Sequence, residues 1–414
     1  MSPKYKSGPL NSETKEVDML SNLPEVVKEK ILSLLPIKEA GRTSILSTQW
    51  RYKWSSIPEL IIKDDLGCDA SVDLHRSVDQ ILFLHHGPIH KFEFRTKKFH
   101  NSGTYHRWLL NLSRNGIREL ILDLQNNYKI HSGLFSCQAL TCLHLCNCTI
   151  ELPRVFEGFK LLQTVKLENF AASEDAIEKL VSSSPLLEDL FLKDFKECII
   201  LNIVAPNLKN LVVEGQFIDI QLSAPGLLNL QVVMDAYPVE DDHIRSNLAK
   251  TLGCLPAIEK LEMHGDFVSY LAYEPLLDIF SVKFNHLKEI CFSIDLTDLK
   301  DAALALLLFQ NSPKLEILNV FHYYFEDDST SGGLDFWEPI ERKDCSFEHL
   351  QIVTIHDFLP SKPMLSFVRF VLSAAPNLIE LTISEENSGV VDQTILKQLL
   401  RLKRVSSNAE IIVV

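Results

Sequence analysis

The sequence predicts an α/β protein in which a small N-terminal helical module is followed by a curved solenoid of parallel strands. Three observations predict this fold. Amphipathic helical patterning occupies the segment before position 60, one apolar strand motif then recurs twelve times, and several copies are separated by helical stretches that end at a proline. A helix–strand unit of this kind can bury its apolar face only against its neighbours, so the units must stack side by side.

The N-terminal module follows a polar stretch, 1–17, that we expect to be disordered. Asn22 is a candidate helix cap, and Pro24 suits an early helical position. The first helix ends at Pro36, a second short segment follows, and a third helix is predicted to begin near Thr48. Three short helices form a core too small to be stable alone, so we expect part of the apolar surface to need a partner. The first helix carries its apolar face at Val27, Ile31, Leu34 and Leu35.

The recurring motif is an apolar residue, two variable residues and an apolar–x–apolar strand, the LxxLxL signature of leucine-rich repeats. Successive copies lie 19 to 35 residues apart. Short steps leave room only for a strand and turns, whereas long steps admit a helix, and helical patterns do precede Pro185, Pro313 and Pro376. We expect the strands to line the inner curve and their central leucines, which include Leu143, Leu190, Leu261 and Leu318, to share one core. The copies begin at Ile89, Ile117, Leu140, Leu162, Leu187, Leu208, Leu227, Ile258, Leu287, Leu315, Leu350 and Leu378.

These patterns resemble the plant family of F-box proteins that carry leucine-rich repeats and end in an FBD domain. The F-box of such proteins is written LPxxxxxxILxxLPxxxxxRTSxLSxxWRxxW, and this chain departs from its common form at Gly41, Thr48 and Gln49. The matching segments are residues 18–62 for the F-box, 63–346 for the repeats and 347–414 for the FBD-like domain.

The resemblance implies a non-catalytic substrate receptor of an SCF-type ubiquitin ligase. The F-box of this family docks on a Skp-type adaptor and through it on a cullin–RING ligase, while the repeats hold a target protein for ubiquitination. The alternative is a leucine-rich-repeat scaffold that is not engaged in a ligase, which the three departures leave open. The resemblance assigns the adaptor contact to Leu23, Pro24, Val27, Ile31, Leu34, Leu35, Pro36, Ile45, Leu46, Ser47, Trp50 and Trp54.

Composition argues against several other classes of protein. With 41 Lys and Arg residues against 55 Asp and Glu residues, the net charge is −14, and an acidic chain repels the phosphate backbone of nucleic acids. The densest apolar run, 302–309, is too short to span a membrane, and residues 1–17 do not resemble a secretory signal. The nine cysteines form no disulfide framework, so we expect a protein of the reducing cytoplasm or nucleus.

The candidate metal ligands fit structural roles better than a metal site. Cys142, Cys146 and Cys148 cluster, but Cys148 falls on the buried position of the pattern LxxLxLxxCxL, and a CxxC pair with matching histidine spacing is absent. The histidine pair at 85–86 is typical of a helix end, and the acidic stretch at 240–243 is typical of a solvated turn. We therefore expect no metal and no cofactor. Motifs for a nucleophile, a phosphate loop or a metalloprotease are also missing from the sequence, so nothing predicts an enzyme.

The segment 323–344 interrupts the regularity of the repeats. It lies in the longest step between motif copies, and it combines an acidic run, a Ser/Thr/Gly stretch and the aromatic residues Phe336 and Trp337. In one interpretation both rings fold back onto the last repeats. In the other they contact the target, because long loops on a rigid scaffold are often functional.

Overall fold

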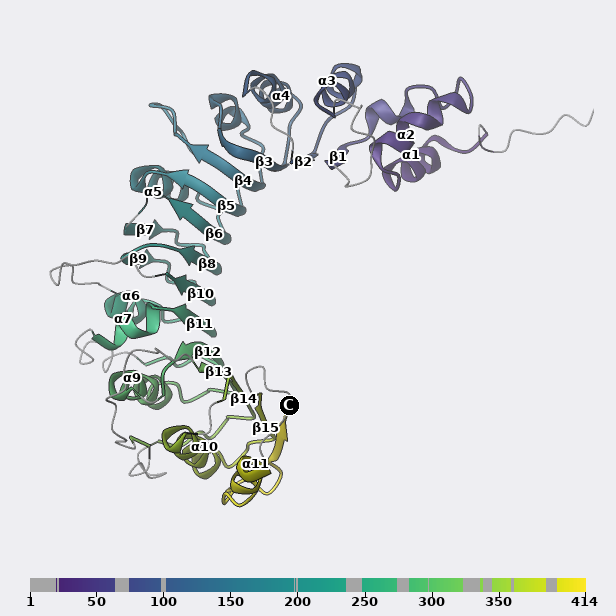
Figure 1. Cartoon of the computed structure of the whole chain (residues 1–414). Coiled ribbons are helices and arrows are strands. Elements are labelled where there is room, and N and C mark those ends of the chain that lie inside the picture. The colour runs from purple at the N-terminus through teal and green to yellow at the C-terminus, as the bar shows by residue number, and fades with distance from the viewer. Residues whose placement is uncertain are drawn as a thin grey trace, which may run out of the picture.

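The computed structural model of the chain is an arc, with the helical module at one end and the parallel strands along the inner side (Figure 1). The predicted tail at 1–17 and most of the 323–344 segment lie outside the residues that the structure describes. No helix among the described residues is both long and apolar enough to cross a membrane. The described residues are 20, 22–63, 74–97, 102–196, 198, 200–235, 248–273, 283–296, 298–322, 336–337, 345–358, 361–384 and 393–414.

The N-terminal module consists of two short α-helices and two 3-10 helices. They are α1 (Glu25–Ser33), α2 (Ile37–Arg42), η1 (Thr43–Ile45) and η2 (Lys53–Ser56). Pro24, rather than Asn22, occupies the N-cap of α1, and no side chain caps that helix. Turns over 48–52 replace the third helix that was predicted to begin near Thr48. These turns end at Tyr52, whose φ of 65° is left-handed, and a left-handed residue cannot continue an α-helix.

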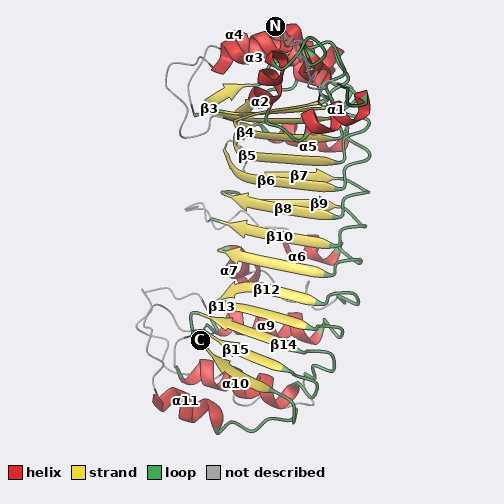
Figure 2. Ribbon diagram, turned by 90° about the vertical axis from the view of Figure 1, so that its right-hand side faces the viewer, coloured by secondary structure: helices red, strands yellow, loops and turns green. Residues whose placement is uncertain are grey.

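Fourteen strands of the described chain pair in one parallel sheet (Figure 2). They are β1 (Glu59–Lys63), β2 (Lys91–Arg95), β3 (Glu119–Lys129), β4 (Cys142–Ile150), β5 (Thr164–Ala172), β6 (Asp189–Lys196), β8 (Asn210–Gly215), β10 (Asn229–Met234), β11 (Lys260–Gly265), β12 (Glu289–Ile294), β13 (Ile317–His322), β14 (Ile352–His356), β15 (Glu380–Ile383) and β16 (Glu410–Val413). Each of the twelve motif copies supplies one strand, from β2 to β15, while β1 and β16 close the two ends. The central motif positions pair in register, as Leu143 does with Val165 and Leu261 with Ile290. The predicted parallel sheet is confirmed.

Helices lie on the outer side of the arc, behind the sheet (Figure 1). They are α3 (Leu74–Leu84), α4 (Ser102–Arg114), η3 (Ser132–Ser136), α5 (Glu174–Ser182), α6 (Leu248–Gly253), α7 (Phe267–Tyr273), α9 (Leu299–Gln310) and α10 (Lys362–Ala374), with α11 (Gln393–Leu400) near the C-terminal end. The three helices predicted before prolines are α5, α9 and α10. Each has a side-chain cap at its N-terminus, from Ser173, Asp298 and Ser361 respectively, and these caps satisfy backbone N–H groups of the first turn.

Two short strands in the middle of the chain were not predicted. β7 (Ile200–Val204) and β9 (Asp219–Ser223) pair in parallel and form a second, two-stranded sheet on the outer side (Figure 1). The short steps in this region were expected to hold only a strand and turns. The additional pairing buries Leu201 and Ile203 against the main core while satisfying the backbone polar groups, as any buried segment must.

One continuous apolar core runs through the repeats. Leu143, Leu190, Leu261 and Leu318 all belong to it, and each side chain is at most 1% exposed. The helical module has its own smaller core, and Ile37 and Ile81 pack against both clusters. The last strands, β14 to β16, continue the same sheet and the same core, so the FBD-like segment extends the solenoid without a break.

The stacked core predicts effects of very different size for an added charge at two adjacent residues. Leu318 points into the core and is 0% exposed, whereas Asn319 follows it on β13 and points to the inner surface. Leu318→Asp is expected to cost more than about 4 kcal/mol of unfolding free energy, because a buried, unpaired carboxylate is very unfavourable. Asn319→Asp is expected to cost less than about 1 kcal/mol. Urea unfolding of both variants measures the difference, and similar midpoints would contradict the assigned strand orientation.

Candidate functional site

The helical module is held together by five buried apolar side chains. The α1 helix is turned so that Leu32 faces inward, where it is 1% exposed. Trp50 and Trp54, which the resemblance assigns to the adaptor contact, are also buried in this core. Their large rings supply much of the apolar surface of so small a core, so they stabilise the module. The core consists of Leu32, Ala40, Trp50, Trp54 and Ile57.

A polar network lies beside this core. Lys28 is buried, and its Nζ donates hydrogen bonds to Gln49 Oε1 at 3.3 Å and to Glu25 Oε1 at 3.4 Å. Lys53 donates to the other oxygen of Glu25, and this hydrogen bond is the largest cause of the lowered pKa of the Glu25 carboxyl. Gln49 is one of the departures from the common F-box pattern, which has a basic residue there. The amide gives the Lys28 ammonium an acceptor where a basic side chain would repel it.

The apolar residues at the outer face of the module are uncovered. Ile45 is 87% exposed, Leu34 72% and Leu46 55%. Monomeric proteins rarely concentrate so much apolar surface on one small module unless a partner covers it. Of the other predicted contact residues, Val27, Leu35, Pro24 and Pro36 are exposed, while Leu23, Ile31 and Ser47 are half-buried.

The inner surface of the sheet divides into two parts. Alternate strand residues point away from the core, and between β1 and β12 several of them form ion pairs with residues of a neighbouring strand. The Nζ–Oε distances of these pairs include 3.0 Å for Lys91–Glu119, 2.9 Å for Lys193–Glu214 and 3.0 Å for Lys260–Glu289. Towards the C-terminal end the central outward positions are neutral. These residues are Cys291, Ser293, Asn319, Phe321, Thr354, His356, Thr382 and Ser384.

An aromatic stack is the main feature of the neutral part. The rings of Phe321 and His356 are parallel, with their centroids 4.2 Å apart, and His264 meets Phe321 edge-on at 5.5 Å. The imidazoles of His264 and His356 are also hydrogen-bonded, to Ser293 Oγ at 2.9 Å and Ser384 Oγ at 3.3 Å. This cluster was not predicted from the sequence, although its members all occupy the position directly after the LxL of their repeats.

Phe336 and Trp337, the residues of the 323–344 segment that the structure describes, fold back onto the repeats. Trp337 is 1% exposed, and its ring lies 4.9 Å from Phe367 and 5.2 Å from Phe370 of α10, between ring centroids. Phe336 packs edge-on against Trp337 and is partly buried in the same core. Burial corrects the interpretation in which Trp337 contacts a target directly, because its ring is enclosed by α10. The rest of the segment lies outside the described residues.

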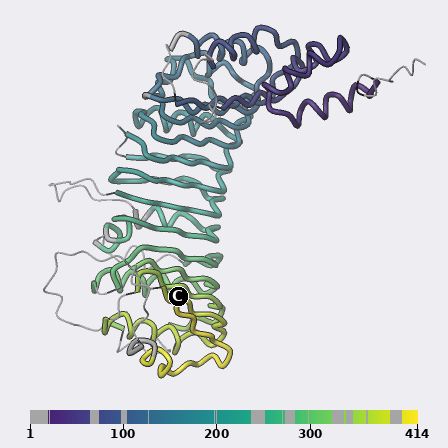
Figure 3. Tube along the Cα trace, turned by 45° about the vertical axis from the view of Figure 1, so that its right-hand side comes forward, coloured from purple at the N-terminus to yellow at the C-terminus, as the bar shows by residue number. Residues whose placement is uncertain are grey.

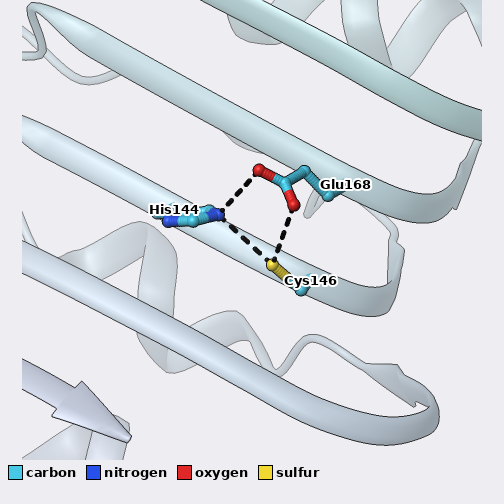
Figure 4. Close-up of side chains that lie close together, drawn as sticks. All are labelled: His144, Cys146 and Glu168. Atoms are coloured by element: carbon cyan, nitrogen blue, oxygen red, sulfur yellow. Dashed lines mark hydrogen bonds and ion pairs between the residues drawn. The ribbon is translucent and has the colours of Figure 1, made fainter. Parts of the chain in front are cut away.

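The candidate metal ligands named from the sequence lie in different environments. Cys148 is buried in the core, as its position in the repeat predicts. His85 bonds the carbonyl oxygen of Ile57 at 2.9 Å, so it attaches α3 to the module. The 240–243 turn lies outside the described residues. Cys146 instead points to the inner surface, beside His144 of its own strand and a glutamate of the next strand (Figure 4).

Two family models match this chain. The F-box domain model matches residues 20–61, and the model of LRR repeats described for FBD-associated F-box protein At5g56370 matches residues 105–269. F-box/FBD/LRR-repeat protein At1g13570 of Arabidopsis thaliana is 35% identical, over 95% of this chain and 98% of that protein. The chain belongs to the F-box/FBD/LRR-repeat family. Its F-box and repeats make it a protein-interaction adaptor.

Two further similar proteins, one of them a solved structure, are as follows. F-box/FBD/LRR-repeat protein At1g51370 of Arabidopsis thaliana is 24% identical, over 96% of each chain. Among solved structures, the leucine-rich repeat-containing protein LegL7 of Legionella pneumophila is 15% identical, with a TM-score of 0.30, covering 86% of this chain and 94% of LegL7.

The Lys28 network of the F-box predicts an effect of restoring the common basic residue. Gln49→Arg is expected to destabilise the module by about 1–3 kcal/mol, because it removes one of the two acceptors of the buried Lys28 ammonium and adds a like charge. Thr48→Lys, at the adjacent exposed position, is the matched control and is expected to change little. Hydrogen exchange of the α1 amides measures the effect. Equal protection in the two variants would argue against the role assigned to Gln49.

The position of Trp337 predicts a stability effect. Trp337→Ala is expected to lower the unfolding free energy by about 3–5 kcal/mol, because it leaves a cavity beside Phe367 and Phe370. Phe336→Ala should cost less, since that ring is only partly buried. Thermal unfolding of both variants provides the measurement, and an unchanged midpoint for Trp337→Ala would contradict the enclosed position of the indole.

Proposed function

We propose that this chain is the substrate-recognition subunit of an SCF-type cullin–RING E3 ubiquitin ligase. Its F-box binds a Skp-type adaptor, and its repeats hold a target protein for ubiquitination. The observation that carries the proposal is the uncovered apolar surface of the F-box, at Leu34, Ile45 and Leu46. Exposed apolar residues on a module that already has its own core are typical of a surface that binds another protein.

The joint between the F-box and the repeats supports a receptor that holds its two partners in a fixed relation. Ile37 and Ile81 pack against both cores, and the backbone N–H of His86 donates to the carbonyl oxygen of Ser55 at 2.9 Å. Gly87 approaches so closely that an added Cβ would lie 3.0 Å from the Cα of Ser56. A tight joint of this kind limits rotation of the module relative to the solenoid. A target on the repeats is therefore held at a fixed distance from the ligase.

The target-binding surface in this proposal is the neutral part of the inner sheet surface, around Phe321 and His356. Aromatic residues are enriched where proteins bind each other. The sheet that carries this stack runs along the inner side of the arc (Figure 1). A protein that binds there does not have to desolvate or break ion pairs, as it would in the charged part of the surface. The free-energy cost of excluding water is therefore smaller in the neutral part.

The mechanism is proximity rather than chemistry by this chain. A receptor that holds a target beside the ligase raises the effective concentration of target lysines near the ubiquitin carrier. The chain itself then needs no catalytic residue, metal or cofactor for this role. Membership of such a ligase places the protein in the cytoplasm, the nucleus or both.

Adaptor binding is tested with an aspartate substitution at each of two positions of nearly equal exposure. Ile45 in the F-box is 87% exposed and Phe83 on α3 is 85% exposed, so an aspartate at either position leaves both cores intact. Ile45→Asp is expected to weaken binding of a purified Skp-type adaptor by roughly 30-fold, which corresponds to about 2 kcal/mol for an apolar contact at an interface centre. Phe83→Asp should bind as the unmodified chain does. Calorimetry measures both affinities.

A chain that does not bind the adaptor at all, while still capturing other proteins through its repeats, would instead be a repeat scaffold outside a ligase. The departures at Gly41, Thr48 and Gln49 motivate this alternative. Equal adaptor binding by the Ile45→Asp and Phe83→Asp variants would show that the exposed apolar surface of the F-box is not the adaptor-binding site.

Target binding is tested on the inner surface. The double variant Phe321→Ala and His356→Ala is expected to lose proteins that co-purify with the full chain while retaining the adaptor, which serves as the internal control. Phe83→Ala, on the outer side, is the matched removal of an aromatic ring. If the double variant and this control retain the same partners in the same amounts, recognition lies elsewhere on the chain.

A further inference from the structure

Three side chains with metal-binding atoms converge on the inner surface of β4 and β5. His144 and Cys146 lie two residues apart on β4, so both project from the side opposite the core residues Leu143 and Leu145. Glu168 on β5 pairs in register with Cys146, which places the carboxylate beside the thiol. Figure 4 shows the three side chains pointing towards one another. Within the part of the chain that the structure describes, this is the one cluster of three such ligands.

One donor atom from each of the three residues lies within 4.8 Å of the other two, which is near the spacing of ligands around a tetrahedral zinc ion. His144 Nε2 lies 3.2 Å from Cys146 Sγ and 3.2 Å from Glu168 Oε1, and Cys146 Sγ lies 3.8 Å from Glu168 Oε2. Zinc bonds of about 2.0–2.3 Å to nitrogen, oxygen and sulfur at tetrahedral angles place neighbouring ligand atoms about 3.3–3.6 Å apart. Small rotations of the three side chains are enough to accept the ion.

The chemistry of the three donors favours zinc over harder cations. Thiolate and imidazole are ligands of Zn²⁺, whereas Mg²⁺ and Ca²⁺ take oxygen ligands. A coordinating thiol gives up its proton to solvent, because the bound cation stabilises the thiolate.

The backbone around the cluster is fixed by an asparagine ladder. Asn147 follows Cys146 and Asn169 follows Glu168, and both have left-handed φ angles, of 57° and 45°. Asn169 Nδ2 donates to Asn147 Oδ1 at 2.6 Å, and Asn147 Nδ2 donates to Asp123 Oδ1 at 3.0 Å. These side-chain bonds hold neighbouring strands together directly after the ligand positions. Such support lowers the entropy lost when the ligands close on an ion.

We propose that His144, Cys146 and Glu168 bind a Zn²⁺ ion on the inner surface of the repeats. Three protein ligands leave one position of the tetrahedron open, as in zinc sites that accept a further donor. The Glu168 side chain is 44% exposed, so the cluster opens to solvent, and a water molecule fills the fourth position in the isolated chain. The same position is accessible to a donor atom of a protein bound on the inner surface.

The test is a metal titration of the purified full chain after treatment with a chelator. Calorimetry with Zn²⁺ is expected to show one site, and titration with Co²⁺ is expected to show a thiolate-to-cobalt charge-transfer band. Cys146→Ser should abolish that band, and His144→Ala and Glu168→Gln should each weaken Zn²⁺ binding by roughly tenfold or more. Glu168→Gln keeps the shape of a partly exposed side chain, so this variant reports on coordination even if another variant unfolds.

Cys291 provides the matched control. Its Sγ lies 3.7 Å from His264 Nε2 on the same surface, but this pair belongs to no group of three ligands among the described residues. Cys291→Ser is expected to leave Zn²⁺ affinity and the Co²⁺ band unchanged. The proposal is overturned if the chain binds no Zn²⁺, if Glu168→Gln and Cys146→Ser bind Zn²⁺ as the unmodified chain does, or if the band depends on Cys291. The result is independent of adaptor binding, which the Ile45→Asp variant tests separately.

Discussion

The stacking of apolar residues from one repeat onto the next is the interaction on which the rest of the structure depends. Leu190 and Leu192 of β6 are fully buried because β5 and β8 carry matching residues at the same register. Parallel pairing then aligns the backbones regardless of what connects them. This explains how steps of 19 to 35 residues fit one sheet, since a helix, a 3-10 turn or the short strands β7 and β9 can equally fill the outer side. The variable part of each repeat lies where packing tolerates variation.

The same stacking determines the functional surface. Because alternate strand residues point away from the core, packing does not restrict their identity, and the inner surface can be charged in one part and neutral in another. Register also brings together residues that lie far apart in sequence. Cys146 and Glu168 are neighbours only because β4 and β5 pair at that position, and the stack of Phe321 and His356 arises in the same way between β13 and β14. A regular scaffold therefore assembles irregular sites.

The F-box differs from the repeats, because it has no continuous core along which its apolar residues can be buried. Its core of five side chains is too small to bury all the apolar residues of the module, and the surplus lies on the outside, at Leu34 and Ile45. Two features keep such a module folded before a partner covers it. The polar network of Lys28 and Gln49 closes one side of the core, and the packing of Ile37 and Ile81 attaches the module to the first repeat.

The sequence by itself determined the family, the twelve strands, the single core and the helices before prolines, because leucine periodicity, helix caps such as Ser173 and proline stops are local signals. It also placed Cys148 in the core. Only the tertiary structure decided which way other side chains point. Helical spacing shows that Val27 and Leu34 share a face, but not that this face is turned to solvent, and the spacing of Trp50 and Trp54 does not show that they fill the core. The direction of Trp337 and the meeting of His144 with Glu168 depend on contacts between distant segments, and no local pattern encodes those contacts.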